Sequence, residues 1–211
     1  MAAPSVTRRR VDGPATGVVL VLHGGRADGL GEVTDGSASW RRSRWMVDQV
    51  AERLTCAGVE VWLLRYGVRG WNAGVGAVPS PIPDARWALE EVRRERAGVP
   101  VVLLGHSMGG RTAVAVADDP AVVGVVALAP WLPIGEPDAP LAGKRLAVAH
   151  GSRDKITSPR QSRAFCQGAQ AVAASVELVD MGRVGHYMLR SVSAWNAFAV
   201  SRSLDMLEVH G

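Results

Sequence analysis

Apolar residues along the chain form short runs that alternate with longer segments of mixed character. Six runs rich in valine, leucine and alanine predict buried parallel strands at 18–22, 59–64, 99–104, 122–128, 145–149 and 176–179. Amphipathic segments between them predict helices at 44–57, 83–97, 107–117, 159–171 and 193–208. An early edge strand is expected at 6–11. This alternation predicts a three-layer α/β/α sandwich with a mostly parallel sheet of six or seven strands.

Polar side chains follow several of these strands. Ser107, Asp154 and His186 each come shortly after a predicted strand, as does the segment His23-Gly24-Gly25. Right-handed crossovers bring the carboxyl ends of parallel strands to one rim of a sheet, and ligands bind at that rim. We therefore expect these residues to lie close together. The chain order Ser, Asp, His is that of one class of hydrolases.

The stretch Gly105-His106-Ser107-Met108-Gly109 matches the G-x-S-x-G pattern of a nucleophile elbow. A serine on such a strand-to-helix turn holds a strained backbone conformation, and side chains two positions away on either side would collide with the turn. The valine- and leucine-rich run before the motif and the small apolar residues after it supply the strand and the helix that the motif requires.

Length, charge and cysteine content narrow the class of protein to which the chain can belong. The chain has 211 residues, a net charge of +4 and two isolated cysteines. We expect a single domain over 1–211, no disulfide framework and no metal site, because neither the cysteines nor the histidines show ligand spacing. No nucleic-acid-binding module, membrane-spanning run or signal peptide is recognisable, so we expect a cytoplasmic protein that binds neither nucleic acid nor membranes.

The chain resembles the α/β-hydrolase superfamily over nearly its whole length. The resemblance rests on His23-Gly24, on the elbow, on His150-Gly151-Ser152-Arg153-Asp154 and on Gly185-His186. It is greatest to small, lidless esterase-like or dienelactone-hydrolase-like members, since only residues 131–144 separate the two strands between which larger members carry a cap. It implies a catalytic triad that works without a cofactor.

In that triad Ser107 is the expected nucleophile, His186 the base that takes its proton, and Asp154 the acid that orients His186. Glu136 is the alternative acid, and Asp154 is favoured over it. The expected oxyanion donors are the backbone N–H of Met108 and that of Gly25, with Arg26 as an alternative to Gly25.

The remaining histidines are expected to be structural. We expect His23 to shape the oxyanion turn, His106 to pack, His150 to be structural and His210 to be exposed at the terminus. Two glycine-rich loops, at 25–43 and 66–80, should overhang the rim.

Substrate contacts are expected from both loops and from the strand end at 128–131. Trp71 and Trp131, with Trp40, are candidates for an acyl pocket, against ordinary aromatic packing. Arginines near the rim could meet a carboxylate on the substrate, although solvated surface arginines are commoner; these are Arg26, Arg65 and Arg69.

Together these observations predict a serine hydrolase of small-molecule carboxylic esters or lactones. Two alternatives remain open. A cyclase, acyltransferase or lyase could use the same serine and histidine, and a ligand-binding module without catalysis could use the same scaffold. The sequence does not predict an oligomeric state.

Overall fold

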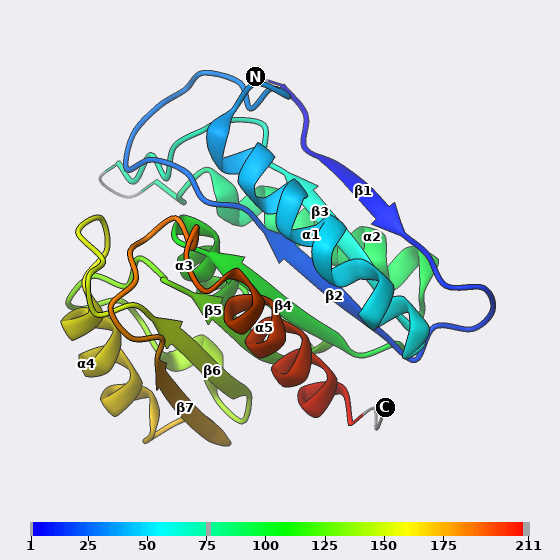
Figure 1. Cartoon of the computed structure of the whole chain (residues 1–211). Coiled ribbons are helices and arrows are strands. Elements are labelled where there is room, and N and C mark those ends of the chain that lie inside the picture. Colours follow the sequence, from blue (N-terminus) through cyan, green and yellow to red (C-terminus); the bar gives the residue numbers. More distant parts are fainter. Residues whose placement is uncertain (1, 75–76, 209–211) are drawn as a thin grey trace.

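A computed structural model of the protein describes residues 2–74 and 77–208 (Figure 1). Seven strands form one sheet in the order β1-β3-β2-β4-β5-β6-β7. The strands are β1 (Ser5–Arg9), β2 (Gly17–Leu22), β3 (Val59–Arg65), β4 (Val101–His106), β5 (Val122–Leu128), β6 (Arg145–His150) and β7 (Ser175–Asp180). Only β1, at the edge, pairs antiparallel with its neighbour, and the other pairs are parallel. The predicted mostly parallel sheet is confirmed.

Helices cover both faces of this sheet. They are α1 (Ala38–Cys56), α2 (Pro81–Glu95), α3 (Met108–Ala115), α4 (Pro159–Ala169), α5 (Val192–Leu207) and the short 3-10 helix η1 (Ala139–Leu141). In Figure 1, α1 and α5 lie side by side on one face, while α2 and α3 lie on the other; α4 packs beside β6 and β7. The three-layer arrangement predicted from the sequence is therefore confirmed, and only a short irregular segment with η1 joins β5 to β6.

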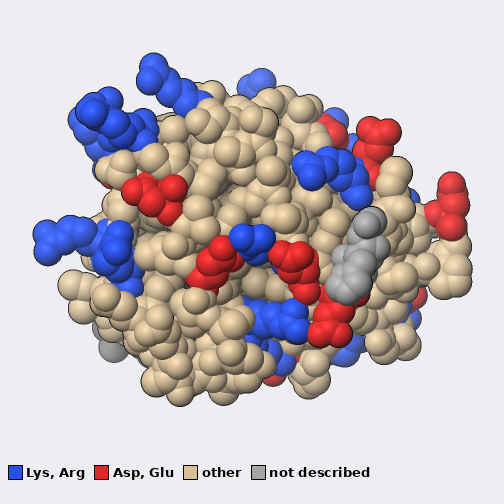
Figure 2. All heavy atoms as spheres, turned by 60° about the horizontal axis from the view of Figure 1, so that its bottom comes forward, with Lys and Arg blue, Asp and Glu red and all other residues tan. Residues whose placement is uncertain are grey.

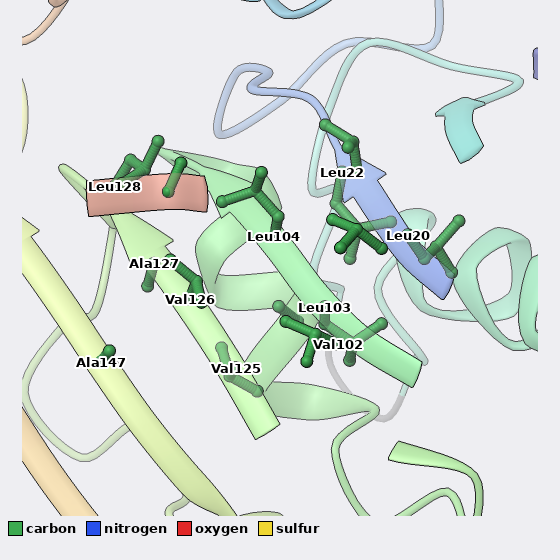
Figure 3. Packing of buried hydrophobic residues seen from close by; sticks show 14 of the residues in the cluster. Leu20, Leu22, Val102, Leu103, Leu104, Val125, Val126, Ala127, Leu128 and Ala147 are labelled. Carbon is green, nitrogen blue, oxygen red and sulfur yellow. The ribbon is translucent and has the colours of Figure 1, made fainter. Parts of the chain in front are cut away.

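The central strands are buried along their whole length. Every residue of β2 and of β4 is buried, and valine and leucine side chains of β2, β4 and β5 pack together between the helical layers (Figure 3). Complete burial of one such side chain contributes about 1.5–3 kcal/mol relative to exposure. The carboxyl ends of these strands are thus held on a tightly packed support.

The largest difference from the sequence-based prediction is the start of α1. The helix was expected from residue 44 but begins at Ala38, with Ser37 in an extended conformation as its N-cap. Gly36 and three serines made this stretch resemble a loop, yet Trp40 is buried and attaches the first turn to the core. The predicted 25–43 loop is therefore shorter, and the first turn of α1 approaches the carboxyl rim.

The other boundaries shift by a few residues at most. The edge strand runs over Ser5–Arg9 rather than 6–11, and β4 ends at His106, immediately before Ser107. The 66–80 loop is attached to the first loop by short bridges at Arg26–Gly70 and Glu32–Val68, and residues 75–76 of it lie outside the described residues.

No helix in the described part of the chain is long and apolar enough to cross a bilayer. On the face drawn in Figure 2, basic and acidic side chains are interspersed over the surface.

Candidate active site

The turn between β4 and α3 holds Ser107 in an unusual backbone conformation. Its φ of 56° and ψ of −119° lie where residues other than glycine are rarely found. The N–H of Ser107 donates to the carbonyl of Leu128, and its own carbonyl accepts from the N–H of Trp131, both at 3.1 Å. The end of β5 and the segment that follows it therefore hold the peptide groups before and after the strained serine.

The two glycines of the motif are required by close backbone packing. A Cβ atom added at Gly105 would lie closer than 3.0 Å to the carbonyl oxygen of Gly109, and one added at Gly109 would lie closer than 3.0 Å to that of Leu22. Backbone atoms cannot give way as the end of a flexible side chain can. The collision with the turn inferred from the sequence is thus confirmed at Gly105, whereas at Gly109 the collision is with the end of β2.

The structure brings Ser107, His186 and Asp154 together in one hydrogen-bonded chain. Nε2 of His186 lies 3.1 Å from Oγ of Ser107, and Nδ1 of His186 lies 2.8 Å from Oδ2 of Asp154. Ser107 and His186 are 7% and 6% exposed, and the Asp154 side chain is 0% exposed. The arrangement lets His186 accept a proton from the serine hydroxyl while its other nitrogen donates to the carboxylate.

Asp154 is surrounded by hydrogen-bond donors. Burial by itself raises the pKa of this carboxyl, but hydrogen bonds from His150, His186 and the backbone of Thr157 and Ile156 outweigh burial and hold the pKa well below its usual range. The two backbone N–H groups donate to Oδ1 at 2.9 and 2.8 Å. Asp154 is therefore ionised at neutral pH, as a partner that stabilises a protonated histidine must be.

Two residues near Asp154 were missed as members of this network. Nε2 of His150 lies 3.2 Å from Oδ2 of Asp154, and the hydroxyl of Thr157 lies 2.8 Å from the same oxygen. Ser162 in turn lies 2.9 Å from Nδ1 of His150. The sequence signal was the four-residue spacing of His150 and Asp154 at the end of one strand; we had expected only a structural role for His150.

His23 and His106 are neutral at physiological pH. Burial lowers the pKa of His23 to about 4 and, together with the neighbouring His186, lowers that of His106 to about 3. Nδ1 of His23 lies 2.6 Å from the carbonyl oxygen of Gly24, and its Nε2 accepts the N–H of Tyr66. His23 thus connects the turn after β2 to the residue that follows β3, whereas His210 lies outside the described residues.

The candidate oxyanion donors lie on two adjoining segments. Met108 is the first residue of α3, so its N–H has no partner within the helix. A Cβ atom at Gly25 would overlap the Met108 side chain, which shows how close the two segments approach. The N–H of Arg26 donates to the carbonyl of Arg69 at 3.0 Å. Arg26 is therefore no longer a suitable alternative to Gly25.

A cavity of about 480 Å³ opens beside Ser107. Residues from the segments after β2, β3, β6 and β7, from the start of α1 and from the elbow line it: Gly24, Gly25, Arg26, Gly36, Ser37, Ala38, Ser39, Arg42, Arg69, His106, Ser107, Ile156, His186 and Tyr187. The nucleophile and the base thus face a space large enough for a small organic molecule.

Comparison with known proteins assigns the chain to a family. A family model described as "Alpha/beta hydrolase family" matches residues 18–206. The chain belongs to the alpha/beta hydrolase family. A comparison with curated proteins found no match.

Solved structures similar to this alpha/beta hydrolase share its fold at low sequence identity. A serine hydrolase without a lid from Xanthomonas campestris is 18% identical, with a TM-score of 0.67, over 96% of this chain and 88% of that one. A thermophilic esterase from the planctomycete Thermogutta terrifontis, with propionate bound, is 16% identical, with a TM-score of 0.73, over 98% and 89%. A protein from Butyrivibrio proteoclasticus, with ferulic acid bound, is 12% identical, with a TM-score of 0.71, over 97% and 96%.

The tryptophans expected in the acyl pocket of this alpha/beta hydrolase lie elsewhere. Trp71 and Trp131 pack edge to face and enclose the guanidinium of Arg111, which lies 4.1 and 4.5 Å from the two ring centroids. Arg111 pairs with Glu136 at 2.6 Å. These indoles stabilise a buried cation behind the elbow and do not line the cavity, and Glu136, the alternative acid, is engaged by Arg111.

Two of the three arginines expected at the rim line the cavity, and the third does not. Arg26 and Arg69 line the cavity of this alpha/beta hydrolase as predicted, but Arg65 pairs with Asp35 and stacks on Trp40. Arg42, which the sequence placed in a loop, takes a place in the cavity wall because α1 begins early. Within 2–74 and 77–208 no group of three or more histidine, cysteine or acidic side chains is arranged to hold a metal ion.

Proposed function

We propose that this alpha/beta hydrolase is a serine hydrolase that cleaves carboxylic esters or lactones through an acyl-serine intermediate. The observation that supports this most directly is the chain of contacts from Oγ of Ser107 through His186 to Asp154, on a strained elbow that opens into a cavity. A nucleophile, a base and a group that orients the base are the three components that such chemistry requires.

In the first half of the reaction, Nε2 of His186 takes the hydroxyl proton of Ser107 while Oγ attacks the ester carbonyl carbon. The carbonyl π-electron pair moves to oxygen, and the N–H groups of Met108 and Gly25 are proposed to stabilise that oxyanion. Removing one such donor typically costs about 2.7–4 kcal/mol of barrier. When the intermediate collapses, the C–O bond to the alcohol breaks and His186 returns the proton to the leaving oxygen.

In the second half, water replaces the alcohol. His186 takes a proton from the water, which attacks the acyl-serine carbonyl. When this intermediate collapses, the bond between the acyl carbon and Oγ of Ser107 breaks, His186 returns the proton to Oγ, and the carboxylic acid leaves. Asp154 stabilises the protonated His186 in both halves and holds its Nδ1–H in place. The low pKa of Asp154 keeps the carboxylate charged throughout.

Two similar structures support the ester class. Propionate is bound to the Thermogutta terrifontis esterase and ferulic acid to the Butyrivibrio proteoclasticus protein, and both ligands are carboxylic acids. An ester hydrolase releases a carboxylic acid as its product. The cavity of about 480 Å³ accommodates a small or medium acyl group.

The test is the initial rate on p-nitrophenyl esters from acetyl to palmitoyl, with Ser107→Ala as the blank. We expect turnover by the wild-type protein alone, with an optimum at a short or medium chain. A fluorophosphonate probe, from which a serine alkoxide displaces fluoride, should add its phosphonyl mass to Ser107. Most activity surviving in Ser107→Ala, or no labelling and no turnover in the wild-type protein, would overturn the proposal.

Product analysis separates hydrolysis from the alternative chemistries. Free acid released in proportion to alcohol indicates hydrolysis. A lactone, or an acyl group found on an added alcohol, would indicate a cyclase or an acyltransferase that uses the same acyl-serine.

A further inference from the structure

The charge of the cavity wall is unbalanced. Three arginines line it, Arg26, Arg42 and Arg69, and the described lining includes no aspartate or glutamate. Within the described chain, none of the three forms an ion pair. Eleven other arginines do pair with carboxylates, including Arg65 and Arg111 close by. The positive charge in the cavity is therefore not neutralised by the protein.

Arg42 is the most firmly held of the three. Its Nε donates to the carbonyl of Tyr187 at 2.7 Å and its Nη2 to that of Met188 at 3.0 Å, while Nη1 is buried without a partner in the described structure. Two neutral carbonyls fix the plane of the guanidinium but cannot cancel its charge. A fixed guanidinium is well suited to binding an anionic group, because the side chain is already ordered before binding.

The amino end of α1 adds to this field. Ala38 and Ser39 line the cavity, and no acidic residue occupies the first turn of this 19-residue helix. The N–H of Arg41 is the first to bond within the helix, to the carbonyl of Ser37. The preceding N–H groups have no intrahelical partner, and the helix dipole places partial positive charge there.

One wall of the same cavity is apolar. Ile156 and Tyr187 line it although they are 62% and 58% exposed, and Tyr187 packs its ring against that of His186. A ligand that satisfies both walls has an apolar part near the base and an anionic part near Arg42.

We infer that the natural substrate carries a second, anionic group, a carboxylate or a phosphate, which binds Arg42, Arg26 and Arg69 at the amino end of α1 while the ester lies at Ser107. This inference rests on the proposed ester hydrolysis in the same cavity. The anionic group takes no part in the bond changes; it binds and orients the ester.

The test compares ester pairs that differ in charge and hardly in shape. Monoethyl succinate, glutarate and adipate are each compared with the ethyl ester of the matching monoamide, in which a carboxamide replaces the carboxylate. Hydrogen bonds to charged groups stabilise by about 1.5–3 kcal/mol, so the wild-type protein should prefer the best anionic ester by roughly ten- to a hundredfold in kcat/KM. The same comparison with esters that carry a terminal phosphate in place of the carboxylate shows which of the two anionic groups gives the higher kcat/KM.

Variants of the arginines show which side chains cause the preference for the anionic ester. Arg42→Gln and Arg69→Gln should each reduce the preference to a few-fold, largely by lowering kcat/KM for the anionic member. Arg41→Gln removes the same charge from an exposed side chain of α1 that does not line the cavity, so it should keep the preference. Arg69→Gln is needed because Arg42→Gln also removes the bonds to the segment that follows His186.

A binding measurement tests recognition of the anionic group without requiring turnover. Calorimetric titration of Ser107→Ala should show tighter binding of monoethyl adipate than of its amide counterpart. Hydrolysis of both members at equal kcat/KM would overturn the inference and leave the proposed function intact. Absence of hydrolysis of these esters and of the p-nitrophenyl esters, with tighter binding of the anion, would overturn the proposed function alone. Equal binding without hydrolysis would overturn both.

Discussion

His150 approaches the same carboxylate oxygen of Asp154 that accepts the hydrogen bond from His186. Nε2 of His150 lies 3.2 Å from this Oδ2, and Ser162 lies 2.9 Å from the other ring nitrogen. With a proton on Nε2, His150 donates to the carboxylate and accepts from the Ser162 hydroxyl. The carboxylate oxygen that binds the base is therefore also contacted by a second, buried imidazole.

The first prediction concerns this second imidazole. His150→Phe keeps a buried ring but removes the donor, and it should lower kcat for ester hydrolysis about tenfold, since a hydrogen bond to a charged group contributes about 1.5–3 kcal/mol. His150→Gln retains a donor and should recover most of the loss. A loss of thermal stability in both variants with unchanged kcat would show that His150 only fills space.

A second prediction distinguishes the two candidate acids. Asp154→Asn should lower kcat on the order of 10⁴-fold with the fold retained, because the amide favours the wrong tautomer of His186. Glu136→Gln should leave kcat within a few-fold but reduce the free energy of unfolding by about 2–4 kcal/mol, since it leaves the guanidinium of Arg111 buried without its partner. Urea denaturation and ester kinetics on both variants give the comparison. A large loss of kcat in Glu136→Gln and a small loss in Asp154→Asn would identify Glu136 as the acid.

A third prediction tests the packing of the elbow. Alanine favours a helix over glycine by about 1 kcal/mol, so Gly109→Ala should be stabilising if helix propensity alone decided. The added Cβ instead meets the backbone oxygen of Leu22, and we expect a loss of at least about 3 kcal/mol. Gly31→Ala is the control, because the nearest atom to its added Cβ is the end of the Arg69 side chain at 4.0 Å. Equal unfolding midpoints for both variants would contradict the steric argument.

The fourth prediction follows from His23 and His106. Their pKa values in the folded protein, about 4 and about 3, lie below the ordinary 6.5, so the unfolded chain binds more protons between these values. The free energy of unfolding should therefore fall as the pH decreases from 8 to 5, by about 2 kcal/mol per histidine. Asp154 contributes in a separate window, below its ordinary pKa of 3.8.

Urea denaturation at pH 8, 6 and 5 measures this dependence. His23→Gln should remove its share of the difference between pH 8 and pH 5, because glutamine does not titrate. A wild-type stability that is constant over this range would contradict burial of the two neutral imidazoles.

The sequence predicted those parts of the site that depend on local rules. Ser107, Asp154 and His186 follow strands, and parallel strands end at one rim, so their meeting could be expected from spacing alone. The need for Gly105 is local, because its neighbour is the backbone of Gly109 in the same turn; the contact of Gly109 with Leu22 depends on the pairing of β2 with β4. The meeting of the triad and the need for Gly105 require only the order of the elements.

Other parts depend on how distant segments pack. Trp71 and Trp131 are far apart in the chain, and only the folded structure shows that both face Arg111. The start of α1 was missed because glycine and serine favour loops locally, whereas burial of Trp40 extends the helix. That error hid Arg42, which belongs to the cavity wall only when residue 42 is helical.

The two hydrogen bonds from Arg42 to Tyr187 and Met188 connect the start of α1 to the segment that directly follows His186. A change on either side of this connection displaces the other, so substitutions in the two segments will show epistasis: their combined effect on turnover will differ from the product of the separate effects. A substitution that alters substrate preference through Arg42 will therefore also alter the alignment of His186.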